Sequence, residues 1–213
     1  MKLTPLHERL LADILDLGSP YPLVLTGGYA VQAHGLVERI SRDLDVATET
    51  PAPMDEIVAS LTAGLTTHVQ TDPLSGRFLV TDPDTGEECE VDVLKEAFWA
   101  PPAQTPYGPV LSLDDVIGTK VRALADRGTV RDLIDVQAAS RHRSTADLET
   151  LGRRRAHDEF SLEDLHDRLT GADWYEDEDY AAYGLTSRQI EKLKRWALEW
   201  AEDLAARIHD ENA

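Results

Sequence analysis

Two pairs of acidic residues stand at alternate positions in segments that have the residue pattern of β-strands. Asp43 and Asp45 flank a leucine, and Glu90 and Asp92 flank a valine. Because successive side chains of a strand point to opposite faces, the two carboxylates of each pair share one face. Two such carboxylates repel each other, and one of them would retain a proton unless a cation lay between them.

Magnesium suits this arrangement, since it binds hard oxygen ligands and commonly uses one or two carboxylates together with substrate phosphates. If the two strands are neighbours, Asp92 joins Asp43 and Asp45 as a third metal ligand. Three carboxylates can hold two metal ions that clamp the attacking and leaving oxygens of a phosphoryl transfer. Acidic proteins also carry aspartates on solvent-facing strands, so the Asp-x-Asp pattern alone is weak evidence for a metal site.

The adjacent glycines Gly27 and Gly28 strengthen the interpretation. They follow a short apolar segment and open a segment with helical character. Glycines at such a turn let backbone N–H groups approach a phosphate, and the N-terminus of a helix favours negative charge. Glycines and aspartates together indicate a metal-dependent site for a nucleoside triphosphate and its magnesium.

The composition limits the possible partners. The chain has 213 residues, enough for one large domain or two small ones, and a net charge of −19. Residues 1–110 contain 6 basic and 17 acidic residues, and residues 111–213 contain 15 and 23. This field repels a polyanion such as RNA, which must therefore be met by a local basic patch or a metal. A single cysteine, Cys89, cannot form an internal disulfide, and no leader or membrane-spanning run is found, so we expect a cytoplasmic protein without membrane contact.

The pattern along the chain changes near residue 110. Helices are expected at 4–17, 29–36 and 51–65, and strands at 21–26, 43–48, 77–81 and 88–94. The turn residues 82–86 predict a hairpin between the last two strands, and the proline-rich segment 100–109 is expected to be a crossing loop and a domain boundary. Beyond it the expected helices are 112–127, 130–142, 146–156, 162–169 and 187–209. The predicted fold class is α+β, with a mixed sheet flanked by helices in domain 1–110 and an α-helical domain in 111–213.

The first helix of the second half carries cations among its apolar residues. Ser112 and Asp115 form a start that resembles a capping box. Lys120 lies on the apolar face, and Arg127 follows seven residues later on the same face. Burying an unpaired charge is costly, so these cations need an anion, and a nucleotide phosphate between the two halves is the first candidate. Alternatively, the lysine stem packs while its ammonium group reaches water.

The next helix begins with further charged residues. Arg131 and Asp135 are four residues apart, a spacing that would let them pair on the helix surface. Asp132 has two possible roles: it activates the attacking group as a base, or it orients Lys120.

These residues resemble the motifs of a known family. Gly27-Gly28 followed by Arg39-Ile-Ser-Arg-Asp43-Leu-Asp45 resembles the first motif of the polymerase-β-like nucleotidyltransferases, and is most similar to that of the AbiEii/AbiGii-type toxins, which include the MenT-type toxins. Lys120-Val-Arg-Ala-Leu-Ala-Asp-Arg127 resembles the family's lysine-x6-arginine motif, and Arg131-Asp132-Leu-Ile-Asp135 resembles the aspartate motif after it. The resemblance spans residues 23–136.

The resemblance implies a polymerase-β-like nucleotidyltransferase domain, followed by a helical region, that transfers a nucleoside monophosphate from an NTP with Mg²⁺ or Mn²⁺. It implies metal ligation by Asp43, Asp45 and Asp92. The nucleotide-binding residues that it implies are Gly27, Gly28, Arg42, Lys120 and Arg127, and Lys120 and Asp132 join the aspartates as catalytic residues. The family's second motif, a lysine followed by Ser/Thr-x-Arg, is matched only by Ser75-Gly-Arg77, without the lysine.

The resemblance also implies an acceptor and a biological setting. The acceptor would be the 3′ end of a tRNA, and the chain would be the toxin of a toxin–antitoxin pair. The acidic charge also suits a polycationic hydroxyl acceptor such as an aminoglycoside-like antibiotic. A regulatory protein that binds a nucleotide without turnover is the non-enzymatic alternative, and the presence of the three aspartates and Lys120 argues against it.

Two charged segments admit a plain and a functional interpretation. Arg141, Arg143 and the run 153–155 form either a solvated helix face or a landing site for the phosphates of an RNA acceptor stem. The acidic run 176–179 is expected to be a solvated loop, with docking of a cationic antitoxin as the alternative. No catalytic part is assigned to three histidines that lack metal-ligand spacing: His34, His142 and His157.

Overall fold

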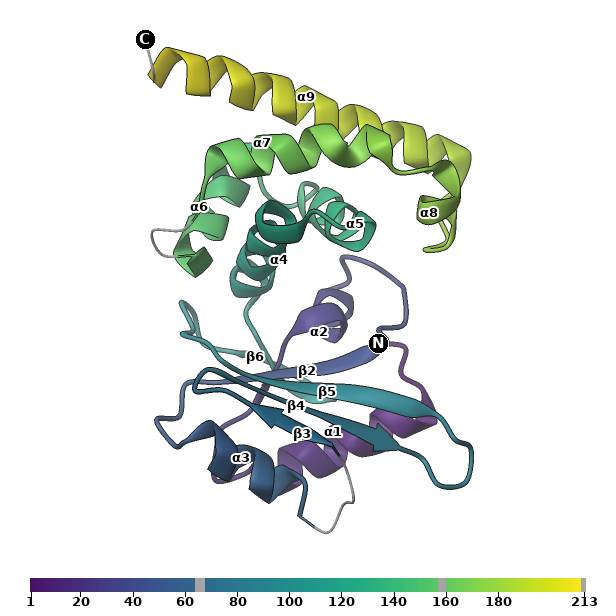
Figure 1. The fold of residues 1–213 in the computed structure, drawn as a ribbon, viewed down its shortest axis with the longest axis vertical. Helices are drawn as coiled ribbons and strands as arrows, with labels where there is room; N and C mark the ends of the chain where they lie inside the picture. The colour runs from purple at the N-terminus through teal and green to yellow at the C-terminus, as the bar shows by residue number, and fades with distance from the viewer. Residues whose placement is uncertain (64–67, 157–159, 212–213) are drawn as a thin grey trace. The chain divides into compact units, whose positions relative to one another are not determined.

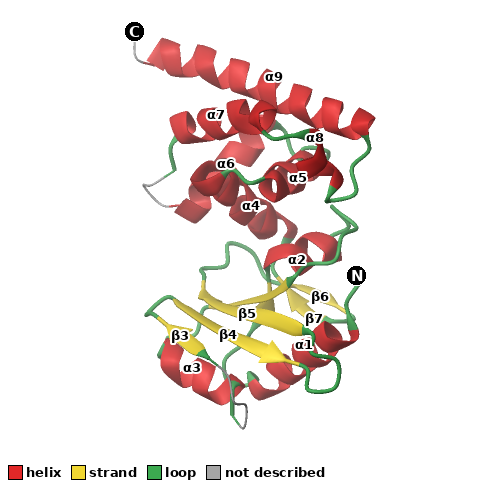
Figure 2. Cartoon of the chain, turned by 45° about the vertical axis from the view of Figure 1, so that its right-hand side comes forward, coloured by secondary structure: helices red, strands yellow, loops and turns green. Residues whose placement is uncertain are grey.

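The computed structural model describes residues 1–63, 68–156 and 160–211. The chain divides into two compact units, Met1–Val116 and Ile117–Ala213, and the division falls inside helix α4 (Leu113–Arg127). The first unit combines a sheet with helices and the second is helical, as Figure 2 shows, which confirms the α+β fold class.

A seven-stranded mixed sheet forms the first unit, with the strand order β3-β4-β5-β2-β1-β7-β6. Its strands are β1 (Val24–Leu25), β2 (Asp43–Thr48), β3 (Val69–Thr71), β4 (Ser75–Thr81), β5 (Glu88–Lys95), β6 (Ala103–Thr105) and β7 (Gly108–Val110). Its helices are α1 (Pro5–Leu17), α2 (Gly27–Ala33) and α3 (Met54–Leu61). In Figure 1, α1 and α3 lie on one face of the sheet and α2 lies on the other.

The pairing of β2 and β5 decides where the acidic residues lie. The two strands are parallel, with Asp43 beside Glu90 and Asp45 beside Asp92. Strand β4 pairs antiparallel with β5, which confirms the hairpin expected at residues 82–86. The carboxylates of both strands therefore share one face of the sheet, as the alternation predicts.

The opposite face of these strands is the core of the unit. Leu44, Val46, Val91 and Val93 are fully buried there. A methyl group added at Gly76 of β4 would lie 2.4 Å from a Val58 methyl and close to Met54, which shows how tightly α3 packs on this face. The acidic residues consequently occupy the face that carries α2.

Two expectations for the first unit are wrong. The segment 100–109 is not a crossing loop: β6 and β7 form a hairpin that adds two strands to the sheet. Gly108, with φ of +104°, makes the tight turn possible, and Thr105 Oγ1 donates to the Gly108 carbonyl at 2.8 Å. Strand β3, three exposed residues at the sheet edge, has no counterpart among the expected strands.

Helices alone form the described part of the second unit, as the sequence predicts. Besides most of α4 they are α5 (Val130–Ala139), α6 (Thr145–Ala156), α7 (Leu162–Thr170), the 3₁₀ turn Gly171–Trp174, α8 (Asp177–Ala181) and α9 (Ser187–Glu211). Figure 1 shows α7 lying along α9, and Leu165, Leu193 and Leu204 are fully buried. Among the described residues, no helix combines the length and apolar character that a membrane crossing requires.

The acidic run 176–179 is solvent-exposed as expected, but it is not a loop: Glu176 caps helix α8, and residues 177–179 lie within it. The Glu176 amide donates to Asp179 Oδ2 at 3.1 Å, and Lys194 of α9 donates to Asp177 at 3.0 Å. Tyr180 is fully buried and donates to the Ala172 carbonyl at 2.7 Å. Capping, an ion pair and one buried aromatic ring thus order a segment whose composition predicts a solvated loop.

Candidate functional site

The glycine turn and Asp45 lie against each other in the first unit. Gly27 begins α2 with φ of +60°, a conformation that favours glycine. A Cβ on Gly27 would lie 1.8 Å from Asp45 Oδ2, and one on Gly28 would lie 2.4 Å from Ser41 Oγ. The Thr26 amide donates to the Asp45 carbonyl at 2.9 Å. The absence of side chains at both glycines therefore admits the Asp45 carboxylate and the Ser41 hydroxyl to the first turn of α2.

Asp45 and Asp92 are direct neighbours across β2 and β5, and Asp43 and Glu90 form the next pair on the same face. The structure thus brings together the three aspartates predicted from the sequence, while their metal ligation stays a prediction. In the described part of the chain, no group of three or more His, Cys, Asp or Glu side chains is arranged to hold a metal ion. Two carboxylates beside a phosphate-sized turn nevertheless fit magnesium, which needs few protein ligands when phosphate oxygens supply the others.

Arg77 of β4 is a cation that lies on this face beside Asp92. Its Nε donates to Asp92 Oδ1 at 2.7 Å and one Nη to Asp92 Oδ2 at 2.8 Å, and its other Nη lies 3.1 Å from Glu90. The hydrogen bonds to Asp92 raise the pKa of Arg77 above its ordinary value. The guanidinium is half exposed, whereas only 16% of the Asp92 side chain is exposed. The arginine of the incomplete second motif is therefore bound to carboxylates of its own sheet.

A buried polar network joins α1 to the segment that precedes Asp43. His7 Nδ1 is hydrogen-bonded to the Tyr29 hydroxyl, which donates to the Ser41 carbonyl at 3.2 Å. Burial lowers the pKa of His7, an effect that Glu87 and Asp43 partly oppose, so His7 is neutral at pH 7. This network is not predicted from the sequence, because His7 has no signal beyond its place in an amphipathic helix.

A second bond ties the same segment to α2. Gln32 Nε2 donates to the Arg39 carbonyl at 2.6 Å, so both ends of the stretch 39–41 are held before β2 begins. Arg42, predicted to bind nucleotide, is exposed at the end of this stretch. The network thus fixes the backbone that leads into Asp43.

The predicted cations of the second unit are paired with acidic residues of the same unit. Lys120 Nζ lies 3.2 Å from Asp135 Oδ2, and the side chains are 9% and 0% exposed. Arg127 donates to both oxygens of Asp132 at 2.8 and 2.9 Å. Asp135 is fully buried and so does not lie on the helix surface as expected, while its pairing with Arg131 stays a prediction.

Asp132 has the contacts of an orienting residue. Its carboxylate is fully buried and accepts hydrogen bonds from Arg127 and from the Thr129 hydroxyl, the latter at 2.6 Å. Burial acts to raise the pKa of Asp132, but the bonds from Arg127 and Thr129 outweigh it and hold the pKa below its ordinary value. A carboxylate that is ionised and already accepts several hydrogen bonds is poorly suited to take up a proton as a base.

The basic region of the second unit is partly committed to packing. Arg153 lies over the Phe160 ring, 5.7 Å from its centroid. Glu149, which stands between the arginines in the sequence, is buried and binds Arg207 at 2.6 Å. The side chain of Arg155 and all of His157 lie outside the described residues.

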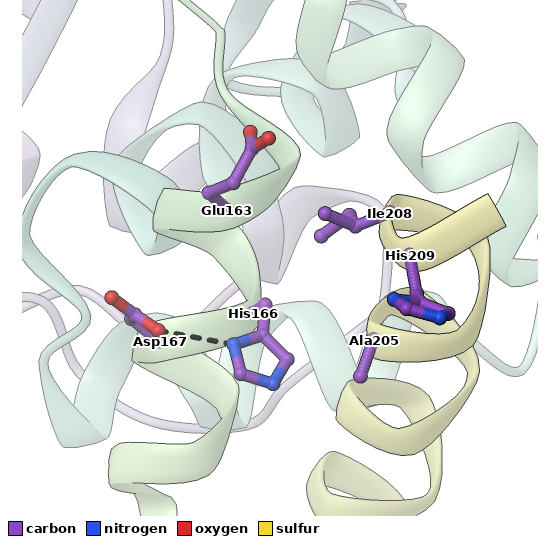
Figure 3. Close-up of a pocket in the computed structure, with 6 residues that line it drawn as sticks. All are labelled: Glu163, His166, Asp167, Ala205, Ile208 and His209. Atoms are coloured by element: carbon purple, nitrogen blue, oxygen red, sulfur yellow. Dashed lines mark hydrogen bonds and ion pairs between the residues drawn. The ribbon is translucent and has the colours of Figure 1, made fainter. Parts of the chain in front are cut away.

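Among the described residues, a pocket of about 380 Å³ lies in the first unit and another of the same volume lies in the second. The four acidic residues Asp43, Asp45, Glu90 and Asp92 form what we call the carboxylate row. The pocket of the first unit adjoins this row and is lined by Gln70, Thr71, Asp72, Ser75, Arg77, Asp92 and Leu94. The pocket of the second unit lies between α7 and α9, where Figure 3 shows His166 projecting toward Ala205. His166 Nδ1 lies 3.0 Å from Asp167 Oδ1, and none of the residues predicted to act in the site lines this second pocket.

Comparison with known proteins gives a match over nearly the whole chain. The profile of the family "Nucleotidyl transferase AbiEii toxin, Type IV TA system" matches residues 9–206. Among solved structures, JHP933 from Helicobacter pylori is 20% identical with a TM-score of 0.59, and the match covers 99% of this chain and 98% of that one. MenT4, a nucleotidyltransferase toxin from Mycobacterium tuberculosis, is 20% identical with a TM-score of 0.58, covering 92% and 82%. A search of the curated proteins gives no match. At these identities the structural likenesses show a shared fold.

Proposed function

The chain belongs to the nucleotidyl transferase AbiEii toxins of type IV toxin–antitoxin systems, and we propose that it transfers a nucleoside monophosphate from an NTP to the 3′ end of a tRNA. As a member of this family, the chain is a nucleotidyltransferase that uses an NTP, and an antitoxin is the other member of its toxin–antitoxin pair. The acceptor, the metal and the roles of individual residues are parts of the proposal.

One observation carries the assignment of the reaction to the first unit. The Asp45 carboxylate lies against the glycine turn of α2 and beside Asp92, so a phosphate-binding turn and a carboxylate row meet at one point. The first N–H groups of a helix have no partner within the helix, and a phosphate satisfies them. We assign the NTP phosphates to Gly27 and Gly28.

Asp43 and Asp45, with Asp92 beside them, are the residues that would hold Mg²⁺ or Mn²⁺. Bound there, the metal would neutralise the charge that develops on the phosphoryl oxygens. Asp92 would have to exchange its bonds with Arg77 to bind a metal, and Asp45 of β2 is the aspartate that lies against the glycine turn. The acidic residues of β2 are therefore the first candidates for ligands.

Three basic side chains and one carboxylate complete the proposed assignment of roles. We propose that Arg42, Lys120 and Arg127 bind phosphates and that Asp132 orients Arg127. In the transfer, the acceptor hydroxyl oxygen forms a bond to the α-phosphorus, the bond to the β-phosphate oxygen breaks, and pyrophosphate leaves while the hydroxyl proton is lost to water. Positioning and charge stabilisation supply most of the catalysis in reactions of this kind.

Transfer of labelled nucleotide tests the proposal. With radiolabelled NTPs, Mg²⁺ and total tRNA, we expect label to enter RNA and to be lost in Asp43→Ala. Asp13→Ala, which removes an exposed aspartate of α1, is the matched control and is expected to keep full transfer. Label that enters an aminoglycoside and no RNA would show that the acceptor is a small polycation. NTP binding by calorimetry without pyrophosphate release on any acceptor would show a non-catalytic protein.

A further inference from the structure

The pocket of the first unit continues the carboxylate row to the edge of the sheet. The cross-strand register places Gln70 of β3 beside Arg77, Arg77 beside Asp92, and Asp92 beside Asp45. Gln70, Arg77 and Asp92 also line the pocket. We propose that this pocket binds the terminal nucleoside of the acceptor, an inference that rests on the proposed transfer reaction.

The two ends of the row differ in what they offer to a ligand. The glycine turn touches Asp45 from the β1 side, and the pocket opens beside Asp92 on the side of β4 and β3. A displacement at phosphorus has the attacking and leaving oxygens on opposite sides of the phosphorus atom. The carboxylate row has the glycine turn, the proposed site of the NTP phosphates, at one end and the pocket at the other. The leaving oxygen would then lie toward the turn, and the pocket is the side that remains for the attacking oxygen of the acceptor.

The charge of the pocket argues against a triphosphate. Its charged lining residues are Asp72 and Asp92, with two negative charges, and Arg77, with one positive charge, which leaves a net charge of −1. The Arg77 guanidinium is bonded to Asp92 and Glu90 and is not directed to a ligand as an isolated cation. A phosphate group would enter a negative field here, whereas a neutral group with many hydrogen-bonding atoms would not be repelled.

The rim of the pocket is held in place by its own hydrogen bonds. Asp72 Oδ1 accepts from the amides of Leu74 and Ser75 at 2.8 and 2.9 Å, and the Ser75 hydroxyl donates to Asp72 Oδ2. The bond from the Ser75 hydroxyl, together with those from the backbone, lowers the pKa of Asp72. The turn between β3 and β4 is therefore shaped before any ligand arrives.

Exposed polar groups on β3 supply the recognition chemistry. The Gln70 amide both donates and accepts, the pattern that pairs with two adjacent atoms on the edge of an adenine base. The Gln70 side chain is exposed and lies on the same face as Arg77. A volume of about 380 Å³ falls within the range of small-ligand sites, so one nucleoside is the appropriate size of occupant.

Two glutamines on opposite edges of the sheet give a matched test. Gln70 is exposed on edge strand β3, and Gln104 is exposed on edge strand β6 at the far side. With tRNA varied at saturating NTP, we expect Gln70→Ala to raise the KM for tRNA about fivefold to tenfold, which corresponds to the loss of one base-edge contact. The KM for NTP stays unchanged in this variant, and both KM values stay unchanged in Gln104→Ala.

Competition by free adenosine gives a second readout. In the wild type, adenosine is expected to compete with tRNA and not with NTP, and its inhibition is expected to weaken in Gln70→Ala. Ser75→Ala, which removes a hydroxyl that lines the pocket on the same face as Arg77, is the second pocket variant, and thermal unfolding of all three variants verifies that they are folded.

The outcomes separate this inference from the reaction that underlies it. An unchanged KM for tRNA in both pocket variants, or an equal rise in Gln104→Ala, overturns the pocket assignment while leaving the transfer reaction intact. A rise in the KM for NTP in place of that for tRNA assigns the pocket to the nucleotide and also overturns the inference. Failure of the wild-type protein to label any RNA refutes the proposed function, and the acceptor pocket falls with it.

Discussion

Replacing Gly27 with alanine tests whether the glycine turn holds the Asp45 carboxylate in the position that nucleotide transfer requires. The new Cβ would lie 1.8 Å from Asp45 Oδ2 and 2.3 Å from its Cγ, far inside van der Waals contact. Rotation of the carboxylate away from α2 would relieve these two contacts, but Asp45 Cβ lies 2.7 Å away and does not move with that rotation, so we expect a small shift of the backbone as well. The left-handed backbone at φ of +60° adds a cost of about 1–2 kcal/mol for an L-residue.

Gly35 provides the control, because it separates backbone strain from displacement of the carboxylate. Its φ is +71°, and a Cβ there would meet no atom within 4 Å. Both alanine variants should therefore lose about 1–2 kcal/mol of unfolding free energy, and at about 2–4 °C per kcal/mol the Tm should fall by about 2–8 °C. Only Gly27→Ala moves a proposed catalytic group, and a misplacement of about 1 Å can cost roughly 100-fold in rate.

The assay compares initial rates of nucleotide transfer and Tm values for the two variants. We expect the Tm of Gly27→Ala to equal or lie below that of Gly35→Ala, transfer within about threefold of the wild type for Gly35→Ala, and a loss on the order of 100-fold for Gly27→Ala. Equal transfer activity in the two variants would refute the reasoning, because the contact with Asp45 would then have no consequence for the reaction.

Two further predictions concern stability. Lys120→Met leaves the fully buried Asp135 carboxylate without its lysine and should lower the free energy of unfolding in urea by about 3–5 kcal/mol; wild-type stability of this variant would contradict the importance of the pair. Hydrogen bonds from the Thr85 amide and then from Arg9 lower the pKa of Asp82 to about 2, below its unfolded value of about 3.9. Its contribution is therefore complete above about pH 4 and is lost as the pH falls toward 2. The Tm difference between the wild type and Asp82→Asn should close over this range, and a constant difference would contradict the assignment.

The sequence predicted the strands that carry acidic residues because their alternation has a single structural interpretation. Apolar residues on one side of β2 and β5 must enter the core, and this places Asp43, Asp45 and Asp92 on the other side. The longer helices of the second half were equally accessible, since helical periodicity depends on residues close in sequence, whereas the five-residue helix α8 was not predicted. Strand alternation and helical periodicity are local sequence signals, and they were sufficient to predict the α+β fold class.

The missed elements depend on contacts that no local pattern contains. Strands β6 and β7 hold three residues each and are strands because they pair with each other and with β1. Arg77 reaches Asp92 across 15 residues of chain, and His7 reaches Tyr29 across 22. Which residues become neighbours across strands or between α1 and α2 is set by the register and packing of the folded unit.

Charge pairing within each unit limits how this acidic protein can hold a phosphate. Three cations highlighted by the motifs are already bonded to carboxylates: Arg77 to Asp92, Lys120 to Asp135 and Arg127 to Asp132. A triphosphate that used any of them would have to compete with an acidic side chain held at hydrogen-bond or ion-pair distance. Backbone N–H groups at the start of a helix have no partner within the helix, but the Asp45 carboxylate and the Ser41 hydroxyl lie against the first turn of α2. A phosphate that used these donors would meet the negative charge of Asp45, so we expect a metal ion between the phosphate and this carboxylate, and the Gly27→Ala variant, which displaces Asp45, tests this arrangement directly.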